Sequence, residues 1–119
     1  TMWRTSCMVY SQWMPEGTKI SGYDLPEAET RVRAFLTEYA ERMLQTGNGE
    51  YDSQIYYPYS IEGYMNLYDF AKKPEDRALA KFTLDYYFAT TALKLVDGHI
   101  AGGMKRGYLP KLAVICRKR

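Results

Sequence analysis

Two carboxylates, Glu50 and Asp52, stand directly before the densest cluster of tyrosines in the chain. Six of the 12 tyrosines fall between Tyr51 and Tyr68. Flat phenol rings with a hydroxyl tip suit the faces of sugars and protein interfaces equally. Two carboxylates can perform acid–base catalysis when they face one bond, but alternate residues of an extended segment point to opposite sides. In the simpler interpretation Asp52 with Ser53 caps a turn, and Glu50 is solvated.

The first four tyrosines of this cluster are predicted to lie in a loop over residues 48 to 59. Asn48-Gly49 and Pro58 punctuate that segment closely on both sides. Helical periodicity does not recruit a tyrosine in a loop, so we expect some of these rings to be exposed, while others cover the helices and bond to backbone. They are Tyr51, Tyr56, Tyr57 and Tyr59. The later pair, Tyr64 and Tyr68, is predicted to be core.

A second group of reactive side chains follows in a glycine-rich loop from Asp97 to Pro110. Glycines permit tight backbone turns and close approach to a ligand. Cations there attract a carboxylate, sulfate or phosphate, and a histidine and a tyrosine supply a base and an acid. These residues are His99, Lys105, Arg106 and Tyr108. The alternative is an ordinary flexible loop with solvated cations.

The sequence lacks the motifs that mark several classes of enzyme and cofactor-binding protein. No P-loop, dinucleotide-binding glycine motif, zinc-spaced cysteine pair or H-E-x-x-H motif is present, so we expect no cofactor. The single histidine, His99, makes a metal site improbable, and none is predicted. Of the two cysteines, Cys7 and Cys116, the simplest interpretation is free thiols, although a bridge closing a long loop is the alternative.

Composition indicates one globular domain spanning residues 1–119, with 46% hydrophobic residues and a net charge of +2. The balanced charge argues against a nucleic-acid partner, because only Arg117-Lys118-Arg119 is locally basic. No apolar run approaches the roughly 20 residues that span a bilayer, so we expect a soluble chain without a membrane partner.

Three helices are predicted to position the two loops. The first begins after Asp24, with Glu27 completing a capping box, and ends at Gly47. Its apolar stripe is Ala28, Val32, Phe35, Leu36, Tyr39, Ala40, Met43 and Leu44. The second helix is capped by Ser60, with the stripe Ile61, Tyr64, Met65, Leu67, Tyr68 and Ala71, and the third runs from Pro74 to Asp97-Gly98. The third carries Leu79, Phe82, Tyr86, Ala89, Leu93 and Val96.

The last two helices are expected to form an antiparallel hairpin, because their connection is very short. Residues 1 to 23 show no long helical period, so we expect a short extended segment around Cys7 to Tyr10 followed by an irregular loop. The fold class predicted is therefore all-α.

The order of these segments resembles part of the large helical-toroid, or (α/α)-barrel, proteins that act on polysaccharides, such as heparinase-type and alginate-type lyases. The similarity rests on "GNGEYDSQIYYPYSIEGYMNLYDFA", on "PEDRALAKFTLDYY" and on a glycine-rich loop ending "KRGY", and covers roughly Gly22 to Tyr108. It implies helical hairpins of a partial toroid, whose two loops share one end and line a sugar-binding cleft.

The resemblance also implies chemical roles for individual residues. Arg106 would neutralise a uronate carboxylate, Tyr57 or Tyr108 would be the acid or base, and His99 a second candidate base. Glu50 and Asp52 would orient sugar hydroxyls or those tyrosines, with Tyr56, Tyr59 and Lys105 also contacting the sugar. The implied partner is a polysaccharide or oligosaccharide, and the implied location is secreted or periplasmic.

Two alternatives stay open at this point. A complete toroid needs about a dozen helices, so the chain is either a piece of a larger toroid or a small self-contained domain that can form a homo-oligomer. Its function is then either β-elimination of an acidic polysaccharide or a non-catalytic helical interaction with a protein. Glycoside hydrolysis through Glu50 or Asp52 is the neighbouring enzymatic alternative.

Overall fold

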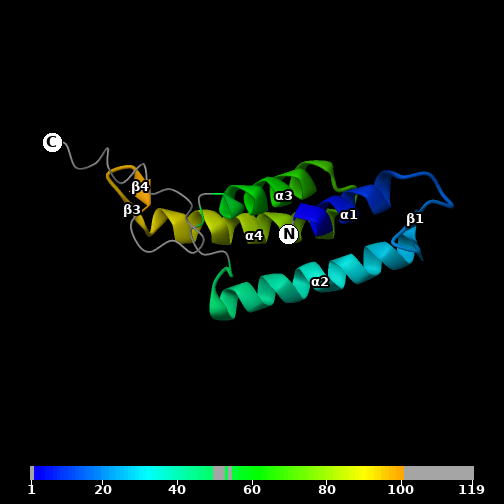
Figure 1. The fold of residues 1–119 in the computed structure, drawn as a ribbon, viewed down its shortest axis with the longest axis horizontal. Helices are drawn as coiled ribbons and strands as arrows, with labels where there is room; N and C mark the ends of the chain where they lie inside the picture. Colours follow the sequence, from blue (N-terminus) through cyan, green and yellow to red (C-terminus); the bar gives the residue numbers. More distant parts are fainter. Residues whose placement is uncertain (1, 50–52, 54, 101–119) are drawn as a thin grey trace.

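The computed structural model describes residues 2–49, 53 and 55–100, which form four α-helices and two short β-hairpins (Figure 1). The helices are α1 (Met2–Trp13), α2 (Leu25–Thr46), α3 (Tyr56–Phe70) and α4 (Pro74–Ala92). The strands are β1 (Lys19–Ile20), β2 (Tyr23–Asp24), β3 (Leu95–Val96) and β4 (His99–Ile100). The all-α prediction is confirmed at this level. No described helix combines the length and hydropathy needed to cross a membrane.

Helix α1 corrects the predicted extended segment and irregular loop at the start of the chain. Its buried face is Thr5, Cys7, Met8 and Ser11, which are mostly small and polar and therefore give no apolar periodicity in the sequence. Two of them satisfy their hydroxyls inside the helix, because Thr5 donates to the Met2 carbonyl at 2.9 Å and Ser11 to the Met8 carbonyl at 2.7 Å. A polar-looking stripe can thus be buried at little cost.

A tight hairpin connects α1 to α2. Strands β1 and β2 pair Lys19 with Asp24 and Ile20 with Tyr23, around a two-residue turn in which Ser21 and Gly22 have φ of 53° and 87°. Positive φ at both turn positions matches the right-handed twist of a hairpin. The hairpin delivers the chain directly into α2.

Helix α2 begins and ends where the sequence predicts. Asp24 is the N-cap residue, although its side chain makes no capping hydrogen bond, so the capping-box contact is wrong. Gly47 is the C-cap with φ of 78°. Most of the predicted stripe faces the core, whereas Leu44 is exposed.

Helix α3 begins five residues earlier than predicted, so Tyr56, Tyr57 and Tyr59 are helical and not in a loop. Pro58 falls in the first turn, where its missing N–H costs nothing, and it therefore does not break the helix. The Ser53 hydroxyl accepts the Tyr56 N–H at 3.2 Å and caps this end. The predicted cap, Ser60, lies inside the helix and donates to the Tyr56 carbonyl.

Helices α3 and α4 form the predicted antiparallel hairpin, but the buried face of α4 is not the predicted stripe. The helix buries Asp76, Ala80, Thr83, Leu84 and Tyr87, while Phe82 and Leu93 are exposed. The helix also ends at Ala92, and residues 95–100 form the β3–β4 hairpin around Asp97-Gly98. Because Asp76 and Thr83 are polar but buried, a search for apolar periodicity does not identify the buried face of α4.

The core lies where the two helical hairpins, α1–α2 and α3–α4, meet. Helix α1 packs on α2 and α3, and α3 packs on α4, with α2 closing the arrangement against α4 (Figure 1). The core residues are Met8, Leu36, Met43, Tyr57, Tyr64, Leu67, Ala71, Ala80, Leu84 and Tyr87. Tyr64 is fully buried as predicted, but Tyr68 is exposed.

Candidate functional site

The connection that follows α2 and the segment that follows α4 begin at the same end of the bundle. Helices α2 and α4 run in the same direction and α3 runs back, so the connection after α2 and the connection after α4 emerge together (Figure 1). A cavity of about 210 Å³ lies between them. Its lining residues are Gly47, Asn48, Tyr57, Tyr86, Thr90, Leu93 and Lys94. We call this the loop-end cavity.

Tyr57 forms one wall of the loop-end cavity and is held firmly by α4. Its side chain is 7% exposed, and its ring meets the Tyr87 ring edge to face with 4.9 Å between centroids. The hydroxyl donates to the Tyr87 carbonyl at 2.8 Å and lies 2.7 Å from the Thr91 hydroxyl. These contacts lock the orientation of the ring, which explains how a tyrosine in the first turn of α3 reaches the core.

The start of the connection after α2 is tied to the helices by a second tyrosine. Tyr39 donates from its hydroxyl to the Asn48 side-chain oxygen at 3.1 Å, and its ring stacks on Phe35. Ser53, on the same connection, is also buried. The described parts of this connection are therefore held in place at both of its ends, beside the cavity.

Two further phenols lie deeper in the same layer of the core. The hydroxyls of Tyr64 and Tyr87 are buried and make no hydrogen bond of normal geometry among the described residues. Their polar neighbours are Thr83 for Tyr64, and Ser60 and Tyr39 for Tyr87. Burial raises the pKa of both phenols well above the ordinary tyrosine range. Both side chains therefore stay neutral and serve the core.

The remaining predicted site residues divide into described and undescribed positions. Tyr56 is half-buried, Tyr59 is exposed on α3, and His99 is exposed on β4 opposite Val96. The described part of the chain does not place these three in one pocket. The other predicted residues lie outside the described residues: Glu50, Asp52, Lys105, Arg106 and Tyr108. Cys116 also lies outside them, whereas Cys7 is a buried free thiol.

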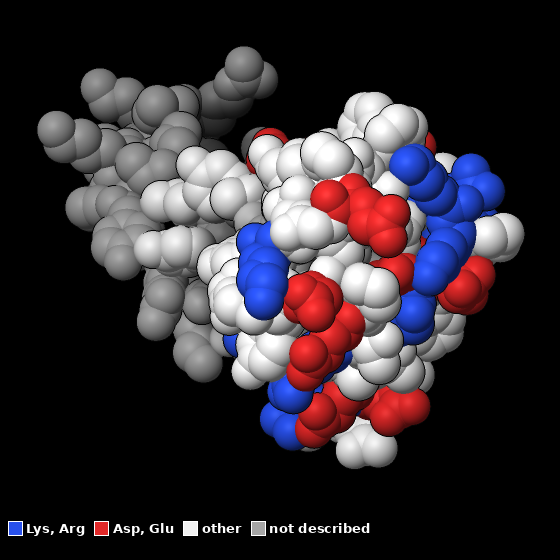
Figure 2. Space-filling view, turned by 90° about the vertical axis from the view of Figure 1, so that its right-hand side faces the viewer, with Lys and Arg blue, Asp and Glu red and all other residues white. Residues whose placement is uncertain are grey.

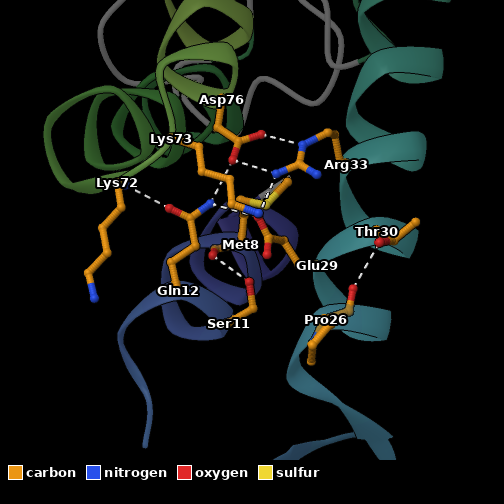
Figure 3. A network of polar contacts seen from close by, with 10 residues as sticks. All are labelled: Met8, Ser11, Gln12, Pro26, Glu29, Thr30, Arg33, Lys72, Lys73 and Asp76. Carbon is orange, nitrogen blue, oxygen red and sulfur yellow. Dashed lines mark hydrogen bonds and ion pairs between the residues drawn. The ribbon is translucent and has the colours of Figure 1, made fainter. Parts of the chain in front are cut away.

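A buried network of charges joins the two hairpins away from this cavity, and sequence reasoning missed it. Arg33 of α2 donates through Nε and Nη2 to the two carboxylate oxygens of Asp76 of α4, at 2.7 and 2.8 Å (Figure 3). The same Nη2 lies 2.5 Å from Glu29 Oε1, and Lys73 Nζ lies 2.7 Å from that oxygen. Glu29 and Arg33, which lie four residues apart on α2, are the one local signal that could have indicated it.

Gln12, near the end of α1, completes this network. Its amide nitrogen donates to Asp76 at 2.6 Å and to Glu29 at 3.3 Å, while its oxygen accepts the Lys72 backbone N–H at 2.7 Å (Figure 3). Trp13 adds a parallel contact, donating to the Phe70 carbonyl at 2.7 Å. All four helices are therefore joined at the turn between α3 and α4.

The electrostatics of the network favour its charged form. Hydrogen bonding to Asp76, opposed by burial and helped by Glu29, raises the pKa of Arg33 far above its ordinary value. Burial raises the pKa of Glu29, but hydrogen bonds and charge from Lys73 and Arg33 outweigh it, so the net pKa is lowered. The two negative charges of the carboxylates are thus balanced by the two positive charges of Arg33 and Lys73. We interpret the network as structural, because each buried charge has a partner.

The part of the chain that the structure describes holds no clustered set of metal ligands. No group of three or more His, Cys, Asp or Glu side chains there is arranged to hold a metal ion. On the face shown in Figure 2, acidic and basic side chains alternate without a broad area of one sign.

Comparisons with known proteins give no information about the function of this site. No protein-family model, no curated protein and no solved structure matches this chain. The helical-toroid resemblance therefore stays a prediction, and the loop-end cavity is the observation from which function is inferred.

Proposed function

We propose that the loop end of the bundle contacts an acidic polysaccharide, as one segment of a helical-toroid protein that cleaves such chains by β-elimination. The loop-end cavity carries this proposal. It joins the segments that precede Glu50 and Asp52 on one side and His99 and Arg106 on the other.

The lining of the cavity suits a sugar. Aromatic rings from Tyr57 and Tyr86 offer apolar faces, Thr90 and Asn48 offer hydroxyl and amide groups, and Lys94 offers a positive charge. Sugars combine apolar ring faces with hydroxyls, so this mixture is complementary to them. Lys94 favours a sugar that carries a carboxylate.

The proposed roles combine the contacts of Tyr57 with the residue types of the two segments. Tyr57 has a fully engaged hydroxyl, which suits it to shaping the cavity wall, so proton transfer falls to His99 or Tyr108. Arg106 would neutralise the uronate carboxylate, because a guanidinium binds a carboxylate with two parallel hydrogen bonds. Lys105, Glu50, Asp52, Tyr56 and Tyr59 would hold the sugar hydroxyls.

The catalytic half of the proposal is tested by mixing the chain with alginate, heparinoids and pectin and following the ultraviolet absorbance of new unsaturated ends. An increase that disappears with Arg106→Ala is expected. A flat trace on all three would remove the lyase activity from this chain. Reducing ends that appear without the ultraviolet signal would indicate hydrolysis through Glu50 or Asp52.

The binding half is tested separately by calorimetric titration of uronate oligosaccharides. Lys94→Met should weaken binding, since it removes the described cation of the cavity. Lys81→Met is the matched control, because Lys81 is an exposed lysine of α4 that pairs with Asp85. Equal effects of the two substitutions would show that only general charge matters.

A non-catalytic interaction with a protein is the second candidate. Large apolar side chains that are exposed on the α3–α4 hairpin favour it, because exposed apolar surface is where protein partners bind. They are Tyr59, Met65, Tyr68, Phe82 and Phe88, each roughly half exposed. A partner bound there would still bind after Arg106→Ala, whereas glycan cleavage would be lost.

A further inference from the structure

A separate pair of adjoining cavities lies where α1, the β1–β2 hairpin and α2 meet. The first has a volume of about 320 Å³ and is lined by Trp3, Arg4, Cys7, Ile20, Ser21, Tyr23, Ala28, Arg31 and Val32. The second, of about 510 Å³, shares four of these residues and continues along α1 to Tyr10 and Met14. We call the two together the α1 groove. Binding pockets for small molecules usually measure roughly 300–1,000 Å³.

The walls of the α1 groove are apolar and partly aromatic. Trp3 is 62% exposed and Tyr23 is 39% exposed, so both rings present free surface beside the groove. Ala28 and Cys7 are buried at its base. Burial raises the pKa of the Cys7 thiol, which therefore stays protonated and behaves as an apolar surface.

The charged residues that line the groove are all cations. They are Arg4, Arg31 and Lys19, and no lining residue of either cavity is acidic. Arg31 pairs with Glu27 at 2.9 Å, and Lys19 pairs with Asp24 at 3.6 Å.

Arg4 differs from the other two cations. Its guanidinium carbon lies 3.7 Å from the centroid of the Phe35 ring, and no carboxylate among the described residues lies within ion-pair distance of it. Stacking on a ring occupies one face of a guanidinium and leaves the N–H donors at its edge available. An anion in the groove would find those donors beside the apolar walls.

We propose that the α1 groove binds a small molecule with a flat apolar body and one acidic group, such as an aryl carboxylate. The apolar body lies between Trp3 and Tyr23, and the carboxylate pairs with Arg4. The charges favour this occupant over a second apolar helix, because a helix would cover the Arg4 guanidinium without supplying an anion to pair with it.

The test compares two ligands of equal shape, 2-naphthoate and the neutral 2-naphthylmethanol, by calorimetric titration of the full chain. Saturable binding of one naphthoate per chain is expected, with the alcohol bound more weakly. Arg4→Gln should weaken naphthoate binding about tenfold and remove the preference for the acid, because a charge-assisted hydrogen bond is lost. Ala28→Phe should abolish binding of both ligands by filling the cavity.

Arg42→Gln is the matched control, because Arg42 is an exposed arginine of α2 that pairs with Glu38 outside the groove. It should leave both affinities unchanged. Arg4 lies on the surface, so circular dichroism should show a folded chain for Arg4→Gln even where Ala28→Phe unfolds.

Three outcomes would overturn the proposal. One is absence of saturable naphthoate binding to the folded wild-type chain. Another is equal affinity for the acid and the alcohol. The third is self-association of the chain, seen by sedimentation, that Ala28→Phe disrupts and naphthoate does not, which would assign the groove to a second copy.

Discussion

Arg33 and Asp76 form a two-point ion pair that joins α2 to α4 beside the turn between α3 and α4. Nε lies 2.7 Å from Oδ1 and Nη2 lies 2.8 Å from Oδ2, and the Asp76 side chain has no exposed surface. A buried carboxylate keeps its charge only while its partner is present. The stability of the bundle should therefore depend strongly on this one arginine.

Replacing Arg33 by methionine should lower the free energy of unfolding by about 3–5 kcal/mol, because Asp76 is left buried and unpaired. Urea unfolding followed by circular dichroism measures the change. The control, Arg42→Met, removes an exposed ion pair with Glu38 and should cost less than about 1 kcal/mol. Similar losses for both variants would contradict a buried role for the Arg33 pair.

The chain should lose stability in acid partly through Glu29. Its pKa in the folded state lies below the unfolded value of about 4.3, because Lys73 and Arg33 hold the charged form. The stabilisation is therefore complete above the unfolded pKa and disappears as the pH falls through the folded pKa. Glu29→Gln should be less stable than wild type at about pH 7, with the difference shrinking toward about pH 3. Thermal melts at both pH values measure this, and a constant difference would argue against the linkage.

Tyr57 and Tyr64 should respond differently to loss of the hydroxyl. Tyr57→Phe removes the contacts to the Tyr87 carbonyl and to Thr91, and should cost about 1–2 kcal/mol. Tyr64→Phe removes a buried hydroxyl that makes no hydrogen bond of normal geometry, and should be neutral or stabilising. Denaturant titrations of both variants decide this, since the ring packing is unchanged in each. A larger loss for Tyr64→Phe would reveal a partner for its hydroxyl.

Gly63 permits the close approach of α3 to α1. A Cβ at this position would lie 2.7 Å from Thr5 Oγ1 and 3.3 Å from Met2 Cα. Alanine favours a helix over glycine by about 1 kcal/mol, but the clash requires α1 to shift, which typically costs about 1–3 kcal/mol. We expect Gly63→Ala to lower the melting temperature.

Asn66→Ala is the control for helix propensity, because Asn66 is exposed on the same helix. It should leave the melting temperature equal or slightly higher. A rise with Gly63→Ala as large as the rise with Asn66→Ala would mean that α1 does not pack closely at this point.

The sequence predicted elements whose signals are local. Asp24 and Gly47 bound α2 because N-cap and C-cap preferences depend on the backbone of one turn. The α3–α4 hairpin followed from the short connection before Pro74, and Tyr64 was recognised as core from helical spacing. By contrast, α1 was missed because its buried face contains small polar residues and gives no apolar periodicity. The start of α3 was misplaced because Pro58 favours a loop in the sequence pattern, although a proline is tolerated in the first turn of a helix.

For the candidate site, the sequence pattern indicated which side chains could be reactive, but it did not indicate where they lie in space. It indicated two segments rich in reactive groups, and it could not show that Tyr57 turns inward to the Tyr87 carbonyl. That orientation depends on Tyr87 of α4, which is 30 residues further along the chain than Tyr57.

The sequence by itself determined a helical chain of balanced charge, with a tyrosine-rich segment that leads into one helix hairpin and a glycine-rich segment after that hairpin. These properties depend on composition and on neighbours within a few residues. Only the tertiary structure decided that Asn48 and Lys94 line one cavity, and that Gln12, Arg33 and Asp76 meet across three helices. The physical reason is that burial of a polar group depends on partners far along the chain, which no local pattern encodes.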